Sequence, residues 1–131
     1  MIVIDASSAL EVLLRTRLAE AVAARIEGAP GPLHAPHLID VEIAQVLRRY
    51  EARRAITPAR AREAAQDWLD LRVTRHAHAV LLPRVWELRH ALSAYDATYV
   101  ALAEALDAPL LTCDGSLARA PGHRARIVLV A

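Results

Sequence analysis

Four acidic residues stand at unusual places in the apolar pattern of this 131-residue chain. Asp5 and Asp114 each end a short apolar run. Glu42 lies within the apolar stripe of an expected helix, and Asp96 lies where another helix should begin. Crowded carboxylates repel one another and lose solvation, and a divalent cation relieves this repulsion. Since oxygen ligands suit Mg²⁺ or Mn²⁺, which activate water and stabilise a leaving oxygen, converging acids here predict phosphodiester hydrolysis.

Each of these acids also has an ordinary structural explanation. An aspartate that follows a strand often caps the next helix, and an acid within an apolar stripe can pair with arginine. Asp96 lies three residues after Ser93, at the spacing of a capping box, so its carboxylate can simply complement the helix dipole. The two roles are compatible, because a capped helix start would also hold Asp96 in place. Ser7 and Thr112 each lie two residues from an acid, and they are candidates to orient ligands or water.

The acids depend on strands and helices that alternate along the chain. Short β-branched or apolar runs predict strands at Met1–Ile4, Leu33–Ala35, Val73–Ala77, Leu110–Thr112 and Ile127–Val130. Helical spacing and start signals predict helices from Ser7 or Ser8 to Leu13, and over Arg17–Glu27, His37–Arg54, Thr57–Leu71, Pro83–Leu92 and Ser93–Leu106. This alternation predicts one α/β domain over residues 1–131 with a mostly parallel sheet. Because parallel strands end at the same edge, Asp5 and Asp114 are expected to be close neighbours there.

Composition narrows the function without identifying it. The net charge is +1 and all 16 basic residues are arginine, so overall charge alone does not indicate nucleic-acid binding. A single cysteine excludes an intramolecular disulfide and a multi-cysteine zinc site. No stretch approaches the roughly 20 apolar residues of a membrane span, and the N-terminus lacks the basic region of a signal peptide. We therefore expect a soluble, cytoplasmic protein with no membrane partner.

The best basic patch follows Glu42 on the same expected helix and contains Arg48, Arg49, Arg53 and Arg54. Arg48 and Arg49 are candidates to bind an RNA backbone, although a solvated helix end that complements the dipole would have the same pattern. Other polar residues fit structural roles better. Asp40 lies in the first turn of that helix, and the pair His76 and His78 lacks the further ligands that a metal site needs.

The motifs also carry a family resemblance. Ile4-Asp5-Ala6-Ser7 opens the chain, and Pro36 to Glu42 with Leu47-Arg48-Arg49 follows. The block from Leu92 to Glu104, with Tyr95-Asp96-Ala97 inside it, precedes Leu110-Leu111-Thr112-Cys113-Asp114. In this order and spacing, the chain resembles PIN-domain ribonucleases over nearly its whole length, and most closely the VapC toxins of bacterial toxin–antitoxin pairs.

This resemblance implies a three-layer α/β/α sandwich with a central, mostly parallel sheet. It aligns Asp5, Glu42, Asp96 and Asp114 with the acidic quartet of the family. It also implies an RNA substrate cleaved with Mg²⁺ or Mn²⁺, a cognate VapB-type antitoxin that inhibits the enzyme, and a homodimer. Asp5, Glu42 and Asp96 are expected to ligate the metal directly, and Asp114 directly or through water.

The residues are also compatible with two other functions. A phosphotransfer domain could use a strand-end aspartate as covalent acceptor, but Ser7 stands where such phosphatases have a second aspartate and the chain has no lysine for phosphate binding. A PIN-like module could instead bind nucleic acid without catalysis. That module would bind RNA equally well with and without divalent metal.

Overall fold

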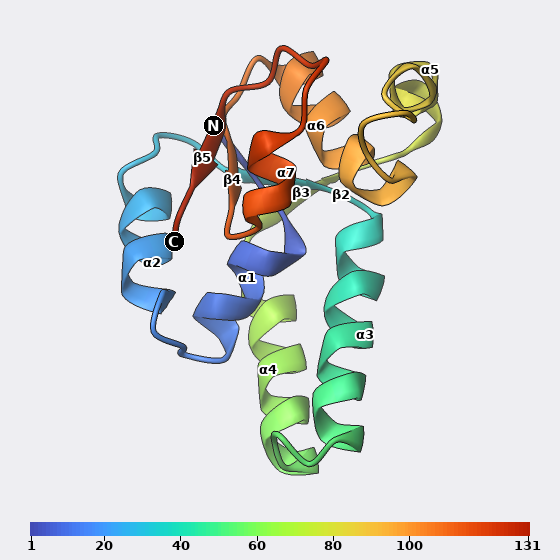
Figure 1. Ribbon diagram of the computed structural model, residues 1–131. Helices are drawn as coiled ribbons and strands as arrows, with labels where there is room; N and C mark the ends of the chain where they lie inside the picture. Colours follow the sequence, from blue (N-terminus) through green and yellow to red (C-terminus); the bar gives the residue numbers. More distant parts are fainter.

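A five-stranded sheet forms the centre of the computed structural model, which describes residues 1–131 (Figure 1). Its strands lie in the order β3-β2-β1-β4-β5, and every neighbouring pair is parallel. The sheet is therefore wholly parallel. The strands are β1 (Ile2–Ile4), β2 (Leu33–Pro36), β3 (Val73–His76), β4 (Leu110–Thr112) and β5 (Ile127–Leu129).

Helices cover both faces of this sheet and complete a three-layer α/β/α sandwich, as predicted (Figure 1). One layer holds α1 (Ala6–Leu13), α2 (Ala19–Glu27), α3 (Leu38–Ala52) and α4 (Pro58–Asp70). The other holds the 3₁₀ turn η1 (Ala79–Leu81), α5 (Leu82–Glu87), α6 (Ala94–Leu106) and α7 (Gly115–Arg119). No helix is both long and apolar enough to cross a membrane.

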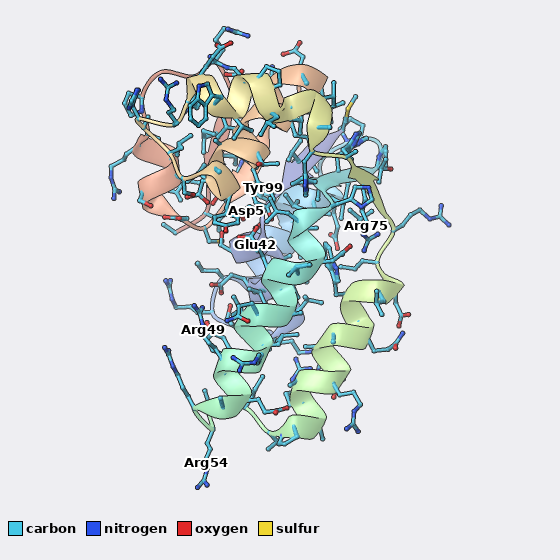
Figure 2. All side chains as sticks on the ribbon, turned by 90° about the vertical axis from the view of Figure 1, so that its right-hand side faces the viewer. Asp5, Glu42, Arg49, Arg54, Arg75 and Tyr99 are labelled. Atoms are coloured by element: carbon cyan, nitrogen blue, oxygen red, sulfur yellow. The ribbon has the colours of Figure 1, made fainter.

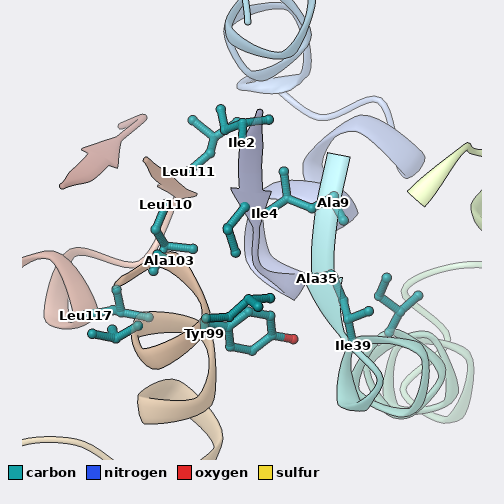
Figure 3. Close-up of a cluster of buried hydrophobic side chains, with 14 of the residues drawn as sticks. Ile2, Ile4, Ala9, Ala35, Ile39, Tyr99, Ala103, Leu110, Leu111 and Leu117 are labelled. Atoms are coloured by element: carbon teal, nitrogen blue, oxygen red, sulfur yellow. The ribbon is translucent and has the colours of Figure 1, made fainter. Parts of the chain in front are cut away.

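The core lies between the sheet and these two layers. β1 is buried along its whole length, with Val3 and Ile4 almost inaccessible, as expected for a strand covered on both faces. Tyr99 is the largest fully buried side chain, and it packs with Ala103 from α6 beneath the strands (Figure 3). Its ring packs in the apolar core, but its buried hydroxyl still needs a hydrogen-bond partner.

Several helices begin at acidic or hydroxyl side chains that act as caps. Ser93 caps α6 as predicted, and Thr57 caps α4, which begins at Pro58. The prediction that Ser7 or Ser8 caps the first helix is wrong, because Asp5 itself caps α1 by accepting a hydrogen bond from the Ser8 amide. Asp5 has extended backbone at the end of β1, so the helix can begin one residue after it.

Two short segments differ from what the sequence pattern suggests. The Gly115–Arg119 segment, for which no element was predicted, forms the short helix α7. The helix expected over Pro83–Leu92 ends at Glu87, and the next residues form tight turns in which the Ala91 amide bonds to the Leu88 carbonyl. Short helices of this kind are set by their caps and by packing, so apolar spacing predicts them poorly.

Candidate active site

Asp5 occupies the innermost position at the carboxyl edge of the sheet and is only 5% exposed. Its Oδ1 accepts hydrogen bonds from Ser7 Oγ (2.7 Å), Ser8 N (2.9 Å) and Ser8 Oγ (3.1 Å). Its Oδ2 accepts one from Thr112 Oγ1 at 2.5 Å. Burial raises the pKa of Asp5, while these donors act in the opposite direction. The carboxylate is therefore held in one orientation by donors from two elements.

Ser7 of α1 and Thr112 of β4 also hold the loop after β4 in place. Ser7 Oγ accepts a hydrogen bond from the Cys113 amide at 3.0 Å, and Thr112 Oγ1 accepts one from the Asp114 amide at 3.0 Å. The parallel pairing of Ile4 with Leu111 makes these contacts possible, because it aligns the ends of the two strands. The expectation that Asp5 and Asp114 would be neighbours at one edge is confirmed in this sense.

Glu42 reaches the same edge from α3 and is partly buried. Its Oε1 accepts a short hydrogen bond from the Tyr99 hydroxyl of α6 (Figure 2). Burial raises the pKa of Glu42, and the nearby charges of Asp96 and Asp5 raise it further. Burial, together with the same contact, raises the pKa of the Tyr99 phenol and keeps it protonated. Tyr99 is thus a permanent donor that fixes the Glu42 carboxylate.

Asp96 lies in the first turn of α6, where the Ser93 hydroxyl accepts a hydrogen bond from its amide at 3.1 Å. Burial raises the pKa of its carboxyl group, and the charges of Asp114 and Asp5 add to this. Asp114 behaves differently because it caps α7. Hydrogen bonds from Ser116 to its Oδ1, at 2.7 and 2.9 Å, lower the pKa of Asp114.

The four acids therefore meet in one electrostatic environment. The charges of Asp5 and Asp96 raise the pKa of Glu42, and those of Asp114 and Asp5 raise the pKa of Asp96. None of the four forms an ion pair with a basic side chain. Three raised carboxyl pKa values without a cationic partner are what a bound divalent cation would relieve, so the donor chemistry fits Mg²⁺ or Mn²⁺.

The four carboxylates lie farther apart than the ligands of a bound metal ion. No three His, Cys, Asp or Glu side chains form a group that could hold a metal ion in this conformation. Donor type and charge thus fit a metal, whereas the assignment of individual ligands stays a prediction.

Two contributing residues were missed by the sequence reasoning, namely Ser8 and Tyr99. Tyr99 lies three residues after Asp96, and this helical spacing was the available signal that both share a face of α6. Its partner Glu42 lies on α3, 57 residues earlier, so no local pattern could identify the contact. Ser8 lies three residues after Asp5, the distance at which an N-terminal cap accepts hydrogen bonds.

Beside Glu42 the surface opens into a groove of about 580 Å³ between α3 and the start of α6. Arg49 lines this groove, whereas Arg48 is exposed on the same helix outside it. Neither arginine takes part in an ion pair. The groove is lined by Ala6, Leu38, Val41, Glu42, Gln45, Val46, Arg49, His78 and Tyr95.

The histidines form contacts that sequence spacing did not reveal. His34 Nδ1 lies 2.8 Å from His76 Nε2 between β2 and β3, while His78 Nε2 accepts a hydrogen bond from the Leu38 amide. His76 and His78 therefore have separate partners. Asp40 is structural as expected, since it pairs with Arg75 at 2.8 Å beside Trp68.

Comparison with known proteins gives consistent results. A sequence model described as the PIN domain matches residues 2–123. Ribonuclease VapC9 of Mycobacterium tuberculosis is 49% identical over 114 residues, which cover 87% of this chain and 86% of the relative. Ribonuclease VapC12 of the same organism is 41% identical over 131 residues, which cover 100% of both chains.

Solved structures agree at the level of the fold. The toxin of M. tuberculosis named VapC20, a sarcin–ricin loop cleaving toxin, superposes with a TM-score of 0.69 at 20% identity, over 90% of this chain and 93% of that one. A chain of the VapBC2 complex from Rickettsia felis superposes with a TM-score of 0.75 at 13% identity, over 100% of both chains. That complex was solved bound to a DNA fragment from its promoter.

Proposed function

The chain belongs to the PIN-domain family and, within it, to the VapC ribonucleases, and from this premise we propose that it is a toxin that hydrolyses RNA with Mg²⁺ or Mn²⁺. The observation that supports this most directly is the set of carboxylates at the sheet edge, whose charges raise the pKa values of Glu42 and Asp96 and none of which forms an ion pair. Asp5, Glu42 and Asp96 would hold the metal, with Asp114 in contact directly or through water. A bound Mg²⁺ or Mn²⁺ supplies Lewis acidity that activates water and offsets charge on the phosphoryl oxygens.

The protein's own residues prepare this site by fixing its oxygens in place. Ser7, Ser8 and Thr112 orient Asp5, and Tyr99 orients Glu42. Because these donors are set by packed elements, the carboxylates lose little freedom when a cation and a phosphate bind. Water would attack phosphorus in line and the 3′ oxygen would leave, giving 5′-phosphate and 3′-hydroxyl ends.

The test is cleavage of total RNA and of a defined RNA by the purified protein, with Mg²⁺, with Mn²⁺ and with excess EDTA. We expect cleavage only with metal, and mapping of the cut ends should find 5′-phosphates. Asp5→Asn and Asp96→Asn should abolish cleavage while circular dichroism shows the fold intact, since asparagine can still cap α1. Asp67→Asn on α4, outside the site, is the matched control and should cleave normally.

Two results would overturn the proposal. Full cleavage in EDTA would exclude the metal-dependent mechanism, and full cleavage by both site variants would exclude these acids as its ligands. RNA binding of equal strength with and without metal, in the absence of any cleavage, would favour the non-catalytic nucleic-acid-binding module instead.

We also propose a cognate VapB-type antitoxin as inhibitor and a homodimer as the state in solution. Solved toxin–antitoxin complexes with the same fold support the antitoxin. The exposed apolar side chains Val80, Leu82 and Trp86 on η1 and α5 offer a surface for a protein partner. Light scattering of the purified protein, alone and mixed with the antitoxin encoded beside it, tests both assignments. A monomer at micromolar concentration would exclude a stable dimer, and RNA cleavage that continues at saturating antitoxin would exclude inhibition.

A further inference from the structure

The groove beside Glu42 has the composition of a nucleotide-binding slot. Apolar side chains make up most of its wall, including Val41, which is 72% exposed, and Val46. The phenol ring of Tyr95 lies at its edge and is 66% exposed. An aromatic ring and aliphatic walls that face solvent suit the flat face of a nucleobase, which stacks well on such surfaces. The volume of about 580 Å³ is ordinary for a small-ligand site.

Polar groups follow one another in order along the groove. On α3, Gln45 lies three residues after Glu42, and Arg49 lies four residues after Gln45. The three side chains therefore lie on one face of that helix. Arg49 is about 10 Å from Glu42 along the helix axis at 1.5 Å per residue. Figure 2 shows Glu42 and Arg49 at successive points along α3, with Arg54 in the turn beyond its end and with Asp5 and Tyr99 at the Glu42 end.

This order matches the covalent order of a nucleic-acid strand. With the acidic edge at the phosphate that is cut, a base would lie against the apolar slot with Gln45, and the unpaired guanidinium of Arg49 would meet the neighbouring phosphate. A guanidinium suits a phosphate because it offers several donors in a planar fork. Charge and polarity therefore favour a nucleotide over an apolar protein segment, which would leave Arg49 without a partner.

We propose that this groove binds the unpaired nucleotide next to the scissile phosphate, with Tyr95 stacking on its base and Arg49 holding its outer phosphate. This inference rests on the ribonuclease function proposed above. The base can enter the groove only when it is free of pairing. Tyr95 and Arg49 are then specificity-determining residues, separate from the carboxylates.

The experiment uses the full-length protein with Mg²⁺ and matched RNA oligonucleotides around a mapped cut. One oligonucleotide carries all its bases, and the others lack a single base on the 5′ or the 3′ side of the cut. Stacking of one base on an aromatic ring corresponds to roughly 5- to 150-fold in binding. For wild type we expect kcat/KM to fall about 10-fold or more with one of the abasic oligonucleotides.

Variants of Tyr95 then test whether the fall in kcat/KM with the abasic RNA is due to stacking on this side chain. Tyr95→Ala should lose a similar factor on the intact RNA and nothing further on the abasic one, because the same contact is removed in both ways. Tyr95→Phe keeps the ring and should therefore keep the loss of kcat/KM that wild type shows with the abasic RNA. Arg49→Ala should raise KM and flatten its salt dependence, whereas Arg62→Ala, an exposed arginine on α4, should do neither.

The outcomes separate this inference from the function on which it rests. If wild type cleaves no RNA with metal, the ribonuclease proposal fails and this one fails with it. If wild type cleaves intact and abasic RNA at equal rates, only the nucleotide slot is refuted. If Tyr95→Ala cleaves normally but binds the antitoxin more weakly, the groove belongs to the protein partner and the slot is likewise refuted.

Discussion

Asp5 accepts four hydrogen bonds from three side chains and one amide in an almost fully buried position. At the scale of single residues, this is the central arrangement of the site. Such bonds stabilise the ionised form, but burial outweighs them and the pKa of Asp5 is raised. The donors therefore contribute both to stability and to the readiness of the carboxylate to bind a cation.

The first prediction concerns Thr112, which is fully buried. Thr112→Val keeps the shape but removes the donor to Asp5 and the acceptor for the Asp114 amide. We expect a loss of about 1.5–3 kcal/mol in the free energy of unfolding, measured by urea denaturation at pH 7. Thr74→Val on β3, which is exposed, is the control and should change stability by less than about 0.5 kcal/mol. Equal effects of the two substitutions would contradict this account.

The second prediction concerns the Tyr99 hydroxyl. Tyr99→Phe keeps the ring in the core but leaves Glu42 without its donor. Loss of a group that orients a ligand commonly costs about 10- to 100-fold in metal affinity or activity, so RNA cleavage should fall by that factor. Tyr50→Phe near the end of α3 should cleave normally. A fall in cleavage that higher Mg²⁺ does not reduce at all would argue against a role through the metal ligand.

At the scale of elements, the Asp40 carboxylate joins α3 to its neighbours. It accepts hydrogen bonds from Arg75 of β3 and, at 2.7 Å, from Trp68 Nε1 of α4. Burial alone would raise the pKa of Asp40, but the hydrogen bonds from Arg75 and Trp68 outweigh burial and lower it. These contacts fix the position of α3 on the sheet, and with it the position of Glu42.

The third prediction follows from that lowered pKa. The folded state holds the Asp40 charge more favourably than the unfolded chain, so this contribution is present above pH 4 and is lost as the pH falls further. Asp40→Asn should reduce the free energy of unfolding at pH 7 by about 1 kcal/mol, a modest value because the pair is partly exposed. The difference from wild type should shrink toward pH 3. A difference that stays constant with pH would mean that charge is not the cause.

At the scale of the whole molecule, repelling carboxylates gather at one edge of an otherwise well-packed sandwich. Asp5, Glu42 and Asp96 all have raised pKa values in the folded state, so their ionisation costs stability as the pH rises through those values. The metal-free protein is therefore less stable at neutral pH than its packing alone would make it. A cation that binds only the folded state reverses this cost.

The fourth prediction tests this relation without any activity assay. Millimolar Mg²⁺ should raise the melting temperature of wild type in a concentration-dependent way, corresponding to about 2.7 kcal/mol at one hundred times the dissociation constant. Asp96→Asn should be more stable than wild type in EDTA at pH 7 and should lose most of the Mg²⁺ effect. Asp67→Asn should respond as wild type does. A Mg²⁺ effect of equal size in all three proteins would indicate non-specific ion binding.

The sequence by itself determined the five strands, most of the helices between them, the parallel sheet and the edge at which Asp5 and Asp114 both lie. These features follow from local apolar patterns and from the rule that parallel strands end on the same side. It also predicted the Ser93 cap that holds Asp96. Such properties depend on residues close in the chain, so spacing is enough to reveal them.

Only the tertiary structure decided which side chains touch. The Tyr99–Glu42 bond and the His34–His76 contact join residues 57 and 42 positions apart, and their distances depend on helix placement and strand register. Trp68 and Trp86 both lie at apolar helical positions of the sequence, yet Trp68 is buried while Trp86 is 65% exposed. An apolar stripe shows that a face can be buried, but whether another layer covers it is decided only when the elements pack.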